Sequence, residues 1–103
     1  MQIILSGTGD APELADADNF KDFRVVAQGA PDAAALAAAT TEIGRSDGAE
    51  HVFVTVPALS RMAGARAEDA TWRADLEGML DVAQKHGWVD AQGAVRAHVE
   101  WRP

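Results

Sequence analysis

Apolar and polar residues alternate along the chain in a way that predicts four β-strands. Residues 94–101 alternate throughout, which is typical of a strand with one buried face and one polar face. Residues 51–56 carry apolar side chains on both faces, which indicates a central strand. Short apolar runs at residues 2–5 and 23–28 predict the other two strands.

Apolar residues at helical spacing predict two main helices and a short one. The alanine-rich segment 33–43 has a high helix propensity and a narrow apolar stripe. Segment 70–86 is the strongest helix, because Asp69 can cap its start and Gly87 can end it in a left-handed conformation. Residues 57–62 begin with a proline, which suits the first turn of a short helix.

Residues 10–22 are rich in acidic side chains and poor in large apolar ones. We expect an acidic loop that has room for one helical turn at residues 11–16. Asp16 and Asp18 have the spacing of the first two calcium ligands of an EF-hand, but Phe20 stands where the third ligand is needed. A solvated loop is therefore favoured, and a weak cation site made by the aspartates stays open as an alternative.

Residues 6–9 follow a predicted strand and contain two glycines, as a phosphate-binding loop does. The dinucleotide-binding fingerprint needs a third glycine where this chain has Pro12. A Walker loop would also need a Lys-Ser or Lys-Thr pair, which does not follow here. We therefore interpret this segment as a tight turn.

Helices and strands alternate after residue 23, which favours an α+β fold, that is, an α/β two-layer sandwich. We expect a single mixed four-stranded sheet with the two main helices on one face, and the ferredoxin-like architecture is the nearest common one. A chain of 103 residues fits one domain, so residues 1–103 are expected to form a single α/β domain. The other face of the sheet would stay uncovered and carry apolar residues, which predicts a homodimer.

The composition excludes several classes of function. The chain has no cysteine, which excludes disulfides, thiolate nucleophiles and cysteine-ligated metal sites. Its net charge of −7, from 9 basic and 16 acidic side chains, argues against nucleic acid and anionic membranes as partners. The first residues lack the basic segment and long apolar run of a signal peptide, so a cytoplasmic location is expected.

The last predicted strand carries the residues with the most chemistry. Its period of two places Arg96, His98 and Glu100 on one face, with His98 and Glu100 about 7 Å apart along the strand. Histidine changes charge near neutral pH and could act as a general acid or base beside an orienting carboxylate, while Arg96 could hold an anionic substrate. The simpler interpretation, which we favour, is that these side chains face water on an edge strand.

Four other residues are candidates for a ligand site. If His51 shares a face with His98, the two imidazoles and Glu100 approach a two-histidine, one-carboxylate metal set, although the sequence does not show whether they converge and we predict no metal site. Trp88 and Trp101 could wall a pocket for a flat apolar ligand, but core packing is the preferred interpretation. Arg61 could contact an anion or be solvated.

Two functions follow from these residues. The preferred one is a small non-catalytic binding or regulatory domain that forms a homodimer and could take a small-molecule ligand, because no catalytic motif is complete. The alternative is a cofactor-free isomerase or lyase that acts by proton transfer on a compact organic acid or carbonyl compound. In that enzyme His98 would be the base, Glu100 its orienting partner, and Arg96 or Arg61 the anion contact.

Overall fold

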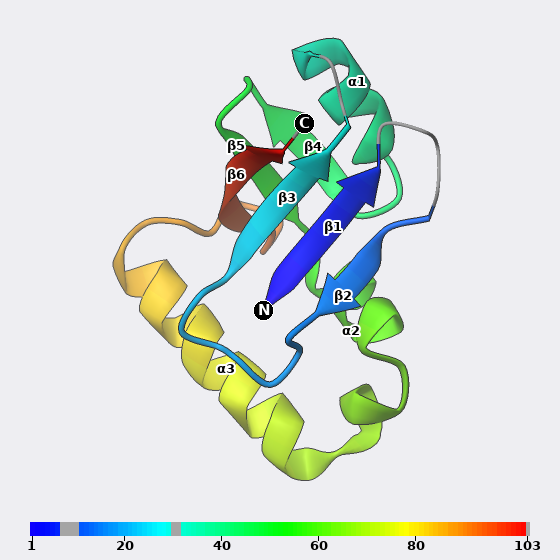
Figure 1. The fold of residues 1–103 in the computed structure, drawn as a ribbon. Helices are drawn as coiled ribbons and strands as arrows, with labels where there is room; N and C mark the ends of the chain where they lie inside the picture. Colours follow the sequence, from blue (N-terminus) through cyan, green and yellow to red (C-terminus); the bar gives the residue numbers. More distant parts are fainter. Residues whose placement is uncertain (7–10, 30–31, 103) are drawn as a thin grey trace.

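A computed structural model describes residues 1–6, 11–29 and 32–102, which form a compact α+β domain around one mixed six-stranded sheet (Figure 1). The elements in chain order are β1 (Gln2–Ser6), β2 (Glu13–Ala15), β3 (Arg24–Gln28), α1 (Ala33–Ala39), β4 (Gly44–Asp47), β5 (His51–Val54), α2 (Val56–Ala63), the 3-10 helix η1 (Gly64–Glu68), α3 (Ala70–Lys85) and β6 (Val95–Arg102). Within this described part, no helix combines the length and the apolar character that crossing a bilayer requires.

The strand order is β2-β1-β3-β6-β5-β4. Strands β1, β3 and β6 run parallel, and β2, β5 and β4 run antiparallel to their neighbours. The prediction of four strands was wrong, because β2 and β4 add one strand to each edge of the sheet. β2 has only three residues and β4 is polar, so neither gives a readable apolar pattern. The helical turn considered at residues 11–16 is also wrong, since β2 lies there.

The ferredoxin-like topology expected from the sequence is not shown. From β3 to β6 the chain does follow the strand-helix-strand-strand-helix-strand succession of that fold. However, β6 lies between β3 and β5 and runs parallel to β3. The most C-terminal strand therefore has neighbours on both sides, which makes the edge-strand interpretation of its polar residues wrong.

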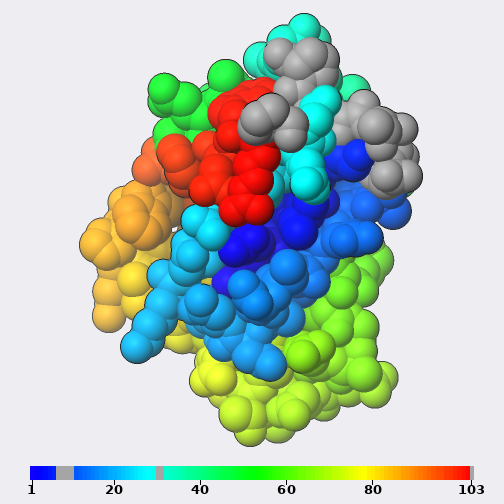
Figure 2. Space-filling model, viewed as in Figure 1, coloured from blue at the N-terminus to red at the C-terminus, as the bar shows by residue number. Residues whose placement is uncertain are grey.

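The core lies between one face of the sheet and the helices. The alternation predicted for the strands is confirmed, because Val95, Ala97 and Val99 of β6 are buried, as are Val52 and Val54 of β5. The helices contribute their own buried side chains to the same cluster: Leu36, Ala58, Leu59, Ala63, Trp72 and Leu76. The opposite face of the sheet, seen in Figure 2 along β6, β3 and β1, is not covered by a helix layer.

Both ends of α3 form as the sequence predicts. Asp69 Oδ1 accepts hydrogen bonds from the amides of Thr71 and Trp72, at 2.8 and 3.2 Å, which satisfies two of the free N–H groups of the first turn. At the other end Gly87 has a φ of 75°, and the amide of Trp88 donates to the carbonyl of Ala83 at 2.9 Å. This is the Schellman arrangement, and it fixes the direction in which the chain leaves the helix.

Helix α1 is shorter than the predicted segment 33–43, because it ends at Ala39. The Thr40 hydroxyl donates to the carbonyl of Ala37, and the chain then turns so that Ile43 is buried and Gly44 begins β4. Gly44 is required there because a Cβ atom would lie 1.8 Å from the Phe53 carbonyl oxygen. The end of the expected helix is therefore a turn that leads into the edge strand β4.

The uncovered face of the sheet is more polar than expected. Arg24 and His98 are register partners across β3 and β6, and Glu100 follows on the same face. A guanidinium nitrogen of Arg24 lies 3.5 Å from Glu100 Oε1, and one of Arg102 lies 2.7 Å from Glu100 Oε2. Ion pairs therefore interrupt the apolar surface on which the homodimer prediction rested, and the homodimer stays a prediction.

Candidate functional site

A groove forms where β6 changes its neighbour. On one side, β6 pairs with β3 only from His98 onward, starting at Arg24. Nearer its start, Val95 bridges instead to Val89, and the amide of Arg96 donates to the Trp88 carbonyl at 2.7 Å. On this side, two separate segments therefore pair with β6: β3, and the segment that contains Trp88 and Val89. The groove lies at the break between them.

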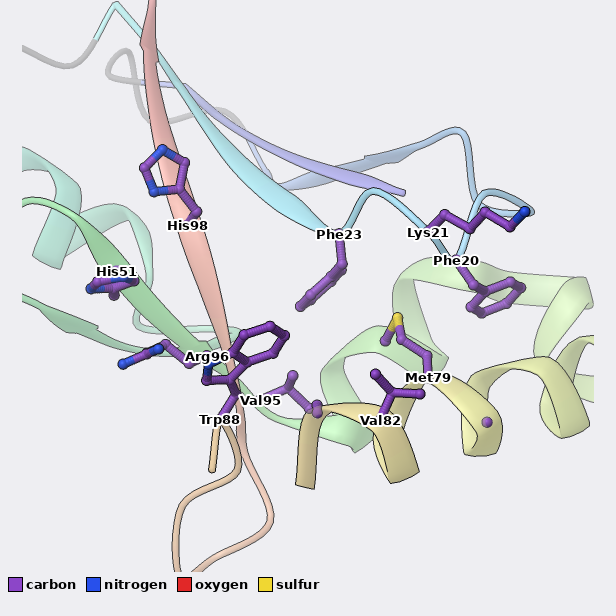
Figure 3. Close-up of a pocket in the computed structure, with 12 residues that line it drawn as sticks. Phe20, Lys21, Phe23, His51, Met79, Val82, Trp88, Val95, Arg96 and His98 are labelled. Atoms are coloured by element: carbon purple, nitrogen blue, oxygen red, sulfur yellow. The ribbon is translucent and has the colours of Figure 1, made fainter. Parts of the chain in front are cut away.

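The groove has a volume of about 630 Å³ and is walled mainly by apolar side chains (Figure 3). The wall residues come from the segment before β3, from α3, and from the turn that leads into β6: Phe20, Phe23, Met79, Val82, Ala83, Trp88 and Val95. In Figure 2 the surface is hollowed between the orange end of α3 and the light-blue segment that leads into β3. Three parts of the chain that are distant in sequence therefore share one concave surface.

The polar lining of the groove is entirely basic. Its ionisable side chains are Lys21, His51, Arg96 and His98, and none of its lining residues is acidic. His51 and His98 are register partners on β5 and β6, and their ring centroids lie 6.2 Å apart in an edge-to-face arrangement. The open question of whether these histidines converge is therefore answered: both lie at one end of the groove, beside Arg96.

The backbone and the indole of Trp88 are both held by contacts with neighbouring residues. Its backbone is fixed by the Schellman turn, and its indole stacks on the His86 imidazole with ring centroids 4.4 Å apart and an interplanar angle of 18°. The preference for core packing was wrong for this residue, since 39% of Trp88 is exposed. An exposed and rigidly supported indole at the groove suits ligand contact.

Trp101 and Trp72 do not share this position. Trp101 is also outside the core, with 38% exposed, and its indole nitrogen donates to the Ala49 carbonyl at 2.8 Å. It does not line the groove, so Trp88 and Trp101 do not form two walls of one pocket. Trp72 alone confirms the core interpretation, and its indole donates to the Ala17 carbonyl at 2.9 Å, which anchors the acidic segment.

The turn that carries Trp88 into β6 is braced by Asp90. Its Oδ1 accepts hydrogen bonds from the amides of Gln92 and Ala94, and its Oδ2 accepts one from Arg45 of β4 at 2.6 Å. The Arg45 guanidinium also lies 4.3 Å over the Phe53 ring. Arg45 above all, and then the Ala94 amide, hold the pKa of Asp90 below its usual value. The edge strand β4 thereby supports the groove from outside.

Glu100 does not share the groove with His98 and Arg96. It is absent from the groove lining, and its carboxylate is held by Arg24 and Arg102 on the uncovered face. Its Oε2 atom and the Arg24 Nε atom are shielded from solvent without a hydrogen bond, although Oε2 lies 2.7 Å from Arg102 in an ion pair. Sequence analysis missed Arg24, because parallel strand register is not readable from one strand.

The remaining candidates lie elsewhere. Arg61, on α2, donates to the Glu42 carbonyl at 3.0 Å and is not part of the groove. Across residues 1–6, 11–29 and 32–102, no group of three or more His, Cys, Asp or Glu side chains could hold a metal ion, so His51, His98 and Glu100 do not make a metal site. The segment of residues 6–9, which the sequence predicts to be a tight turn, lies outside the described residues except for Ser6.

A second hollow, of about 680 Å³, lies beside the acidic segment. It is bounded by Leu14 and by residues 16–19, with Arg66 of η1 on its other side. Arg66 Nε lies 3.3 Å from Asp18 Oδ1, so an arginine of the same chain already meets this aspartate. Asp10, which the sequence interpretation grouped with Asp16 and Asp18, lies outside the described residues.

Comparison with protein-family models, with curated proteins and with solved structures finds no match to this chain. The groove geometry therefore carries the functional argument.

Proposed function

We propose that this protein is a cytoplasmic, non-catalytic binding domain whose groove holds a small organic anion with an apolar body. The charge of the groove carries this proposal: its ionisable lining residues are all basic, whereas the chain has a net charge of −7. A cleft lined by one sign of charge concentrates ions of the opposite sign. The apolar walls and few polar groups are typical of small-molecule sites, whose volumes are about 300–1,000 Å³.

Arg96 is the best anion contact in the groove. Four other arginines already form ion pairs with carboxylates: Arg24 with Asp22 and Glu100, Arg45 with Asp90, Arg66 with Asp18, and Arg102 with Glu100. Among the residues that the structure describes, Arg96 has no such partner, and it lines the groove beside His98. An unpaired guanidinium is a ready donor of two parallel hydrogen bonds to a carboxylate.

Isothermal calorimetry with compact apolar carboxylates tests the proposal. We expect at least one to bind, and Arg96→Gln to weaken it about tenfold or more, since a hydrogen bond to a charged group contributes about 1.5–3 kcal/mol. Arg61→Gln is the matched control, because Arg61 is an arginine outside the groove. Binding by no carboxylate, or an equal loss in both variants, would contradict the proposal.

A proton-transfer enzyme is the second candidate, because His98 lines the groove beside Arg96. Its weakness is the carboxylate: Glu100, which would orient His98, is held by Arg24 and Arg102 instead. Exchange of carbon-bound hydrogen for deuterium in a bound carboxylate, followed by NMR, tests this function. Exchange that is catalysed by the wild type and lost in His98→Gln would replace the binding function with the enzymatic one.

A further inference from the structure

We propose that the ligand is a planar aromatic carboxylate whose ring stacks on Trp88 while its carboxylate pairs with Arg96. This inference rests on the proposed function and names the chemical class that the same groove would select. It comes from three features of the groove: an indole supported on one side only, a second aromatic wall that is also supported, and a cationic residue whose backbone is hydrogen-bonded to that of Trp88.

The indole of Trp88 is a platform with one free side. His86 covers one face at a centroid distance of 4.4 Å, yet 39% of Trp88 remains exposed and the residue lines the groove. Aromatic pairs prefer offset-stacked or edge-to-face arrangements, and a ring that is already oriented loses little conformational entropy on binding. A flat ring is therefore the shape that this surface accepts best.

The opposite wall is aromatic and supported as well. Figure 3 shows the Phe23 ring and the Trp88 indole projecting toward the same space, with Met79 beyond them on α3. Phe20 lies further along the wall, where its ring meets that of Trp72 at a centroid distance of 5.7 Å. Rings and a thioether are polarisable surfaces that favour an aromatic ligand over an aliphatic one of equal size.

The backbone of Trp88 is hydrogen-bonded directly to that of Arg96. The amide of Arg96 donates to the carbonyl of Trp88 at 2.7 Å, so the two residues are immediate neighbours across the turn and β6. We therefore expect the carboxylate to be attached to the ring directly or through a short link of one or two atoms.

The test compares three probes of similar size: 2-naphthoate, its non-planar saturated analogue decahydro-2-naphthoate, and the neutral 2-naphthamide. Dissociation constants are measured by calorimetry on the full chain. We expect 2-naphthoate to bind about fivefold more tightly than the saturated acid, which is the size of an aromatic pair contribution. It should also bind about tenfold more tightly than the amide, which lacks the charge that strengthens the contact with Arg96.

Trp88→Leu should remove the preference for the aromatic acid, so that 2-naphthoate and its saturated analogue bind equally. Trp101→Leu is the matched control, since 38% of Trp101 is exposed but it lies outside the groove. Trp88→Phe should keep part of the preference, and its circular dichroism and thermal midpoint check that the fold survives. The indole also reports binding directly, because quenching of tryptophan fluorescence by 2-naphthoate should be lost in Trp88→Leu and kept in Trp101→Leu.

The outcomes separate this inference from the proposed function. Equal affinity of the wild type for the aromatic and the saturated acid, with Arg96 still required, would overturn the aromatic class and leave the anion-binding function in place. A preference that Trp88→Leu retains, while remaining folded, would overturn the role of Trp88. If neither acid binds at millimolar concentration, both the inference and the proposed function fail.

Discussion

The backbone amide of Arg96 donates a hydrogen bond to the carbonyl oxygen of Trp88, with 2.7 Å between the two atoms. This bond joins the end of the α3 Schellman turn to the first part of β6. The backbones of the two residues that we assign to ligand binding are therefore held next to each other, whatever rotamers the indole and the guanidinium adopt. The turn between them, held by Asp90, becomes a natural point at which to perturb the groove.

Asp90→Asn should lower the free energy of unfolding in a manner that depends on pH. Asparagine keeps an acceptor for the amides of Gln92 and Ala94 but loses the charge that pairs with Arg45. The pKa of Asp90 is lowered in the folded state from its ordinary value of 3.8, with the Arg45 hydrogen bond as the largest cause. The stabilisation is therefore fully present above pH 3.8 and is lost as the pH falls through the lower folded-state pKa.

Urea denaturation at pH 7, 5 and 3 checks this prediction. The difference in the free energy of unfolding between wild type and Asp90→Asn should be equal at the two higher pH values and smaller at pH 3. Asp75→Asn is the control, because it removes an exposed charge of the same sign from α3. A difference for Asp90→Asn that does not change with pH would show that the ion pair contributes nothing.

Gly44→Ala and Gly78→Ala should have opposite effects. A Cβ atom at Gly44 would lie 1.8 Å from the Phe53 carbonyl oxygen, on a backbone with a φ of 155°, so we expect a loss of more than about 2 kcal/mol. A Cβ atom at Gly78, inside α3, meets nothing within 4 Å, and alanine there should stabilise by about 0.5–1 kcal/mol. Thermal midpoints decide both, and a stable Gly44→Ala would mean that β4 does not pair with β5 in this register.

Glu100→Gln should affect stability but leave ligand binding intact. It removes the charge that lies between Arg24 and Arg102, and we expect a loss of about 1 kcal/mol, because the pairs are only partly buried. The dissociation constant for 2-naphthoate should change less than about twofold, since Glu100 does not line the groove. A large loss of binding in a fully folded Glu100→Gln would instead favour the enzyme in which Glu100 orients His98.

The homodimer remains to be tested by light scattering during size-exclusion chromatography. If the homodimer forms, the mass should be twice that of the 10.9 kDa chain. A monomer mass at every salt and protein concentration would contradict the homodimer.

Local patterns predicted the elements that bury apolar side chains. The strands β1, β3, β5 and β6 form close to the expected residues, and α3 is capped by Asp69 and followed by the left-handed Gly87, as predicted. These elements are readable because their hydrophobic period and their capping residues agree. The three-residue strand β2 and the polar strand β4 give no such pattern, so they were missed.

Strand order and the groove depend on contacts that no local pattern encodes. The position of β6 between β3 and β5 decides that Glu100 meets Arg24 and that His98 meets His51. The sequence placed Arg96, His98 and Glu100 on one face, as the structure has them, but it could not show that the third lies outside the groove. Trp88 and Trp101 were assigned to the core from residue type alone. Residue type does not show which positions the helices leave exposed.

The insertion of β6 between β3 and β5 has a consequence for how the protein folds. Before β6 is in place, β3 on one side and β5 on the other have no common neighbour, so the half-sheets β2-β1-β3 and β5-β4 each expose an unpaired edge. Closing the sheet requires β6 to find β3 across some seventy residues of intervening chain. Folding should therefore be slow for a chain of this size, because the entropy of closing this long loop is lost before the non-local contacts stabilise the sheet. During that interval the two open edges are where aggregation would begin.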